Sequence, residues 1–314
     1  MKELIHKSIS KNRKILQYVF IITVFGFLAH IFISNYDQLK SNPVKLNFVY
    51  ISISVLLLWI SKILSGTGWY IITKSYGIST NFKKTWKYWI QSQLGRYIPG
   101  KIWMVVSRAY LYTQENVSLK DLSYLFLLEN IFAVSAASVY CFFSIAMIDH
   151  SGLTGYIALS ALLFIAGIVF IKSRLLPVIV NLFLRLLKRK PIERITLSNK
   201  NISITFCAYL LQWFFLIWSF YYVANSVTII PDNSFFYLST ALSLSAIAGI
   251  AAFFVPAGLG VRESIITAIL SAVLPVSHAV IISVLFRIVT TTAELFIIAF
   301  TSLIISNDKV VTLR

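Results

Sequence analysis

The chain has 314 residues, of which 58% are hydrophobic and only 12% are charged, and its mean hydropathy is +0.81. This balance excludes a soluble globular domain and indicates a polytopic membrane protein. The net charge is +17, but the sequence has no basic, aromatic-bearing surface domain to bind a nucleic acid. The two cysteines and four histidines have neither disulfide nor metal-ligand spacing, so we expect no metal and no cofactor.

Apolar runs of about 20 residues predict membrane-spanning helices. We place seven of them, at residues 15–34, 47–72, 121–148, 153–172, 201–229, 235–256 and 278–305. The apolar segments 86–104 and 262–274 are short or interrupted, and we interpret them as re-entrant or half-spanning broken helices. The predicted fold is an all-α polytopic membrane protein. It is a single domain over residues 1–314, and the sequence favours two related halves, at about 1–172 and 201–306.

The distribution of basic residues sets the predicted orientation. Five Lys or Arg precede residue 15, four lie in 74–87 and eight in 172–200, whereas 149–152 and 230–234 have none. Basic loops stay on the cytoplasmic side, so we expect both termini in the cytoplasm, with the protein in the plasma or inner membrane. Residues 174–190 combine an apolar stripe with a basic face, which predicts an interfacial helix. It either rests on the membrane or binds anionic lipid.

Two stretches interrupt their apolar runs with Pro and Gly beside charges, one from Leu94 to Trp103 and one from Val255 to Glu263. Broken backbone in lipid lacks hydrogen-bond partners and survives only where protein buries it or where it lines a wet cavity. One such segment in each half indicates the site of a transported ligand. Glycine N–H groups beside Arg and Lys favour a phosphate-sized site, and the alternative is a simple interfacial kink. The residues expected at a lipid headgroup are Arg96, Pro99, Gly100, Lys101, Arg108, Gly258, Gly260, Arg262 and Arg287.

Charges inside the apolar runs need partners. We interpret Lys62 as snorkelling to the cytoplasmic interface, whereas Glu129 either pairs with an arginine or lines a cavity. Arg287 lies about 15 Å deep at 1.5 Å per residue, and Glu294 is too far along the same helix to pair with it. Arg287 therefore needs Glu129, Glu263 or an anionic ligand. The three glutamates Glu129, Glu263 and Glu294 are candidate proton carriers or members of a polar route.

These motifs resemble a known family. Arg96-Tyr-Ile-Pro-Gly-Lys-Ile-Trp103, then Arg108, then Asp121 through Glu129 resembles the first half of the membrane domain of lysylphosphatidylglycerol synthases, a flippase-like family. Pro256-Ala-Gly-Leu-Gly-Val-Arg-Glu263 followed by Arg287 is similar to its second half, although the family often has Pro-Gly-Gly here. The resemblance covers nearly the whole chain. It implies lipid handling between leaflets, with an anionic phospholipid or polyprenyl-linked sugar as partner, and a link to polysaccharide and cell-envelope assembly.

The function that the sequence favours is a lipid translocase driven by an ion gradient or mass action, because no nucleotide-binding loop is present. We expect it not to be an enzyme: it has no catalytic motif, and the soluble aminoacyltransferase domain of the synthases is absent from this sequence. The alternative is a non-enzymatic membrane partner of a glycosyltransferase or another enzyme of envelope assembly. A third hypothesis, a membrane-embedded transferase, requires Asp37 as its carboxylate.

Overall fold

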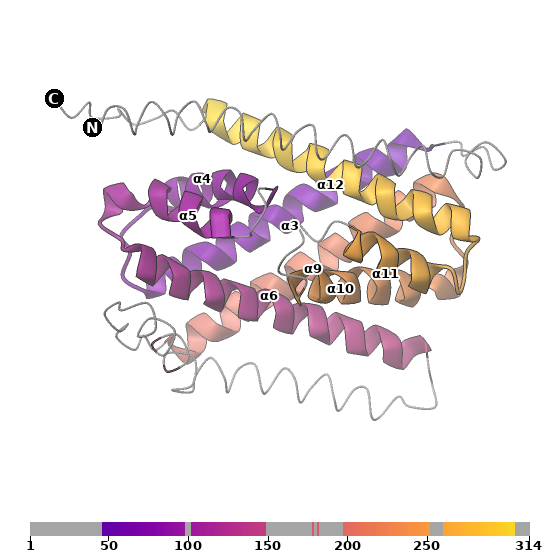
Figure 1. The fold of residues 1–314 in the computed structure, drawn as a ribbon, viewed down its shortest axis with the longest axis horizontal. Helices are drawn as coiled ribbons and strands as arrows, with labels where there is room; N and C mark the ends of the chain where they lie inside the picture. Colours follow the sequence, from indigo (N-terminus) through magenta and orange to yellow (C-terminus); the bar gives the residue numbers. More distant parts are fainter. Residues whose placement is uncertain are drawn as a thin grey trace.

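A computed structural model describes residues 46–97, 102–148, 178, 181, 197–251 and 260–304, and the regular elements in these ranges are all helices (Figure 1). Five helical segments are long and apolar enough to cross a membrane. They are α3 (Phe48–Ser75), α6 (Leu119–Ile148), α9 (Asn199–Val227), Asp232–Ile250, which includes most of α10 (Phe235–Ala251), and α12 (Val276–Ile304).

These five correspond to five of the seven predicted spans. The other two, at 15–34 and 153–172, lie outside the described residues, as does Asp37. The predicted interfacial helix 174–190 also lies outside them, except for two helical positions, Val178 and Asn181.

Shorter helices fill both interrupted regions. The first contains α4 (Phe82–Ser92), the 3-10 turn η1 (Gln93–Tyr97) and α5 (Ile102–Leu111), and the second contains α11 (Val261–Leu270). Short polar side chains begin several helices: Asn47 accepts a hydrogen bond from the Val49 N–H, and Asn81 accepts one from the Lys84 N–H. Such caps satisfy backbone donors that have no partner within the helix.

The segment α4–η1–α5 folds back on itself and forms a hairpin, which we call the first hairpin. The hydroxyl of Ser107 contacts the Ser92 carbonyl, and a Cβ added to Gly95 would lie 2.6 Å from the Met104 nitrogen. Only a residue without a side chain allows the two limbs to approach so closely. The residues between the limbs, 98–101, lie outside the described ranges.

Helices α3 and α9 form the centre of the molecule and run antiparallel. Ser54 contacts Ser219 through side-chain oxygens 2.8 Å apart, and further along α3 the Ser61 hydroxyl accepts a 3.2 Å hydrogen bond from Gln212. Small and short polar residues let two helix backbones come close in a membrane, and their hydroxyls satisfy one another there. Ser61 and Gln212 are each the fourteenth residue of their helix, so the pairing is symmetric about this contact.

The order of helices repeats on either side of this central pair. In the first half, α3 with 28 residues is followed by α4, a break, the ten-residue α5 and the 30-residue α6. In the second half, α9 with 29 residues is followed by α10, a break, the ten-residue α11 and the 29-residue α12. In Figure 1 a half-turn in the plane of the picture exchanges α12 with α6, and α4 and α5 with α10 and α11.

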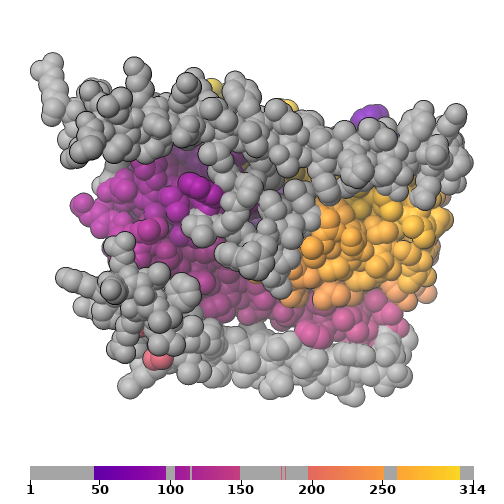
Figure 2. Space-filling view, viewed as in Figure 1, coloured from indigo at the N-terminus to yellow at the C-terminus, as the bar shows by residue number. Residues whose placement is uncertain are grey.

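Contacts between the halves repeat in the same way. Ser144, the twenty-sixth residue of α6, donates a 2.6 Å hydrogen bond to Ser239, the fifth residue of α10. Thr301, the twenty-sixth residue of α12, accepts a 3.3 Å bond from the indole of Trp86, the fifth residue of α4. The described helices thus form two similar units in opposite orientation. Figure 2 shows the purple first hairpin on the left of one face, α11 and α12 in orange and yellow on its right, and α6 in pink running below them.

We predict that Ser54→Cys with Ser219→Cys forms a disulfide under mild oxidation, because the two side-chain oxygens are already in contact. The experiment uses a background in which Cys141 and Cys207 are alanine, and it is read as a gel mobility shift after cleavage between the halves.

The control pairs Ser54→Cys with Ser226→Cys, which lies seven residues along α9 and hence about 10 Å further away. Equal cross-linking in both pairs would contradict the antiparallel register.

Candidate functional site

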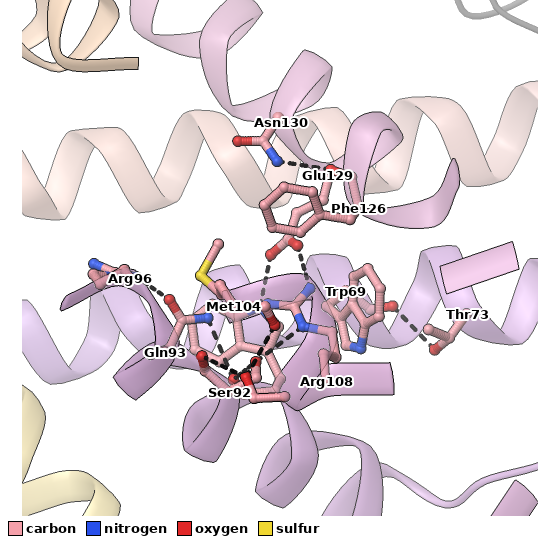
Figure 3. Close-up of polar contacts among 12 residues, drawn as sticks. Trp69, Thr73, Ser92, Gln93, Arg96, Met104, Arg108, Phe126, Glu129 and Asn130 are labelled. Atoms are coloured by element: carbon pink, nitrogen blue, oxygen red, sulfur yellow. Dashed lines mark hydrogen bonds and ion pairs between the residues drawn. The ribbon is translucent and has the colours of Figure 1, made fainter. Parts of the chain in front are cut away.

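Arg108 on α5 and Glu129 on α6 form a buried ion pair at the first hairpin (Figure 3). Arg108 is 1% exposed, and its Nε donates a 2.9 Å hydrogen bond to the Ser92 hydroxyl. The other carboxylate oxygen of Glu129 accepts a 2.6 Å bond from the indole of Trp89. Of the two interpretations left open for Glu129, pairing with an arginine is therefore the correct one.

Aromatic rings enclose the Arg108–Glu129 ion pair. The Arg108 guanidinium lies 4.1 Å from the ring centre of Trp69 and 5.5 Å from that of Phe126. The Trp69 indole in turn donates to the Tyr112 hydroxyl, and burial raises the pKa of Tyr112 to about 12, so the phenol stays neutral. Arg108 was expected at a lipid headgroup. Its enclosure gives it a structural role instead, that of holding the hairpin against α6.

In the second interrupted region α11 packs against α10, and we call these two helices the second hairpin. It also carries an ion pair, with the charges exchanged between the short helix and the following span. Glu263 on α11 lies 3.5 Å from Arg287 on α12, which identifies Glu263 as a partner among the candidates expected for Arg287. Glu263 also accepts a 2.7 Å bond from the Gly260 N–H, closing the start of α11. That N–H was expected to face an anionic headgroup, but here it is occupied by the protein's own carboxylate. Gly260 has φ +80°, which favours glycine.

The third ion-paired group joins the two halves. Lys62 on α3 donates a 2.8 Å hydrogen bond to Oε1 of Glu294 on α12, and Nη1 of Arg96 lies 3.4 Å from the same oxygen. We call Lys62, Arg96 and Glu294 the central triad. The snorkelling interpretation of Lys62 is wrong in this structure, because its ammonium turns to a buried carboxylate. Figure 3 shows that Arg96 points away from the Arg108–Glu129 pair.

The central triad lies deep in the helical bundle. Lys62 is the fifteenth of 28 residues in α3, about 20 Å from either end of the helix at 1.5 Å per residue. Glu294 is only 3% exposed, whereas the side chains of Arg96 and Lys62 are 33% and 19% exposed. The cations are therefore more accessible than the carboxylate that holds them. Lys62 was absent from the expected site, although the predicted span 47–72 already placed it near the middle.

Arg262 also lies near the triad, close enough to act electrostatically on Lys62. Its side chain packs on Gly249 of α10, where an added Cβ would lie 2.5 Å from its Nε. The remaining residues expected at the headgroup lie outside the described residues: Pro99, Gly100, Lys101 and Gly258. Among the described residues, no group of three or more His, Cys, Asp or Glu could hold a metal ion.

A comparison with protein families decides the relationship. The family model described as the lysylphosphatidylglycerol synthase TM region matches residues 11–298. The chain belongs to this family. A search of curated proteins found no match. This member of the lysylphosphatidylglycerol synthase membrane-region family is a multi-pass membrane protein of a lipid-related family, as the resemblance implied.

In this family member we predict that Arg108→Met lowers the free energy of unfolding by about 3–5 kcal/mol, because it leaves Glu129 buried without its cation. The double variant Arg108→Met with Glu129→Leu should recover most of that loss, since no unpaired charge remains. Thermal unfolding in detergent micelles measures both.

The matched control is Lys84→Met. Lys84 pairs with Glu115 at 2.5 Å, and this hydrogen bond raises the pKa of Lys84, but its side chain is 38% exposed. An exposed pair contributes about 0–1 kcal/mol, so we expect little change. A similar small effect from Arg108→Met would show that the buried pair has no structural role.

Proposed function

We propose that this protein is a lipid translocase of the flippase type. It moves an anionic phospholipid or a polyprenyl-linked sugar between the leaflets of the plasma or inner membrane, with both termini in the cytoplasm. One observation carries the proposal: Lys62 and Arg96 share the single carboxylate of Glu294 in the interior of the bundle. The mechanism involves no covalent step.

Placing these cations at membrane depth is costly. Each lysine or arginine at the centre of a bilayer costs at least about 2.5–3.5 kcal/mol on insertion scales. Together with Arg262, the three ion-paired groups described above hold five cations and three carboxylates: Lys62, Arg96, Arg108, Arg262 and Arg287 with Glu129, Glu263 and Glu294. A transported anionic headgroup would offset this surplus of positive charge, which supports an anionic ligand.

The arrangement of the two halves supports movement between leaflets. Transporters with inverted repeats hold their ligand near the bilayer midplane, where broken helices of the two repeats meet. Here the first hairpin supplies Arg96, and Glu294 comes from α12 of the second half. The headgroup would pass between the halves at the central triad while its acyl chains stay in lipid. An ion gradient or mass action would supply the driving force.

We predict that the purified protein transfers labelled anionic phospholipid across liposome membranes, and that Arg96→Met slows this transfer about 10- to 100-fold. The reason is that a hydrogen bond to a charged group contributes about 1.5–3 kcal/mol. Lys84→Met, which removes a lysine from an exposed pair elsewhere, should transfer at the wild-type rate. A fluorescence-quenching assay of the outer leaflet measures the rates.

Labelled anionic phospholipid and lipid-linked sugar that both stay in their original leaflet would contradict the proposal. Such a result, together with cellular function that survives Arg96→Met, would favour the alternative of a membrane partner for an envelope-assembly enzyme. Co-purification of that enzyme with the protein then gives a direct readout.

A further inference from the structure

The repeat shows that the fold does not require a charged pair where Lys62 meets Glu294. Lys62 is the fifteenth residue of α3, and the fifteenth residue of α9 is Trp213. Glu294 is the nineteenth residue of α12, and the nineteenth of α6 is Ala137. At this equivalent crossing both residues are buried, and Trp213 donates a 3.0 Å bond to the Ala133 carbonyl. The positions equivalent to Lys62 and Glu294 therefore carry an indole and a methyl group, so the repeat by itself does not call for charges there.

The geometry of Glu294 resembles that of a bound ligand. A single oxygen, Oε1, receives both the Lys62 ammonium and an Arg96 guanidinium nitrogen, on α3 and on the first hairpin. The second terminal nitrogen of Arg96 donates to the Gln93 side chain, which orients the guanidinium. Two cationic donors converging on one oxygen are the arrangement that also binds a phosphate oxygen.

We propose that Lys62 and Arg96 form a binding site for a phosphate ester, and that Glu294 is the counter-ion occupying it until the ligand arrives. The phosphate oxygen takes the place of Oε1, and the carboxylate gives up its two cations. The exposed fractions fit this exchange, because the cations are 19% and 33% exposed and can meet a ligand while Glu294 stays enclosed. The lipid identity of the ligand rests on the proposed function, but the anion site itself does not.

This inference separates the three glutamates. Glu129 is held by Arg108 and Trp89, and Glu263 is held by Arg287 and the Gly260 N–H, each within its own half. Glu294 alone among them is bound from the other half of the chain. Exchange at Glu294 would therefore loosen a contact between the halves, which the other two pairs would leave intact.

The test compares the binding of dioctanoyl phosphatidylglycerol to wild type, Glu294→Gln and Lys62→Met by calorimetry in detergent micelles. Glu294→Gln removes the competing charge while keeping the shape of the side chain, so we expect binding about 10- to 100-fold tighter than in wild type. Lys62→Met should lose a similar factor. Equal affinity of wild type and Glu294→Gln, or undiminished binding by Lys62→Met, would overturn the proposal.

A second variant covers the case in which a single substitution prevents folding. Lys62→Met with Glu294→Leu removes both charges and imitates the apolar crossing of the other half. We expect it to fold, with wild-type thermal stability or better, and to lose binding. Retained binding in this variant would overturn the assignment of the site.

The probes separate the possible sources of the phosphate. Dioctanoylglycerol lacks the phosphate, and its binding with equal affinity would overturn the site. If inorganic phosphate binds and the lipid does not, the anion site is supported and a lipid is excluded as its ligand. If Glu294→Gln tightens binding but the protein does not transfer lipid between leaflets, only the proposed translocase function is rejected. If transfer proceeds but Glu294→Gln does not tighten binding, only the counter-ion role of Glu294 is rejected.

Discussion

A charge or a broken helix inside a bilayer must find its partner within the protein, because lipid offers none. The described structure follows from this constraint. Each hairpin is fixed to its following span by one ion pair, Arg108 with Glu129 in the first half and Glu263 with Arg287 in the second. The central pair α3–α9 satisfies its hydroxyls and amides in the same way, by contacts between the halves.

Two of the three ion-paired groups each lie within one half, whereas the central triad joins the two halves. Both hairpin pairs join a short helix to the span that follows it, although their charges are exchanged and their positions within the helices differ. Within the described helices Lys62 and Glu294 have no charged counterparts, because Trp213 and Ala137 stand at the equivalent positions. A buried, charged contact whose counterparts in the other half are uncharged directs attention to that contact as a place of function.

The sequence predicted the positions of the described helices well, but it predicted the ion-pair partners of only some charged residues. Hydropathy alone located the five described spans, and Pro and Gly located the interruptions. Glu263 was among the expected partners of Arg287, together with Glu129 and an anionic ligand. The partner of Lys62 is 232 residues away, on a helix whose rotation no local pattern sets. The sequence favoured two related halves, but the antiparallel register of α3 and α9 came only from the structure, because it depends on contacts between residues far apart in the chain.

The close contact at Gly95 has a mechanical consequence. With backbone against backbone, the two limbs of the first hairpin cannot slide past each other and must shift as one stiff body. Any displacement of Arg96 near the tip therefore also moves the far end of the hairpin, where Lys84 on α4 meets Glu115 beyond α5. A movement at Arg96 would thereby be carried to the exposed Lys84, some 15 Å or more away along the limb at 1.5 Å per residue.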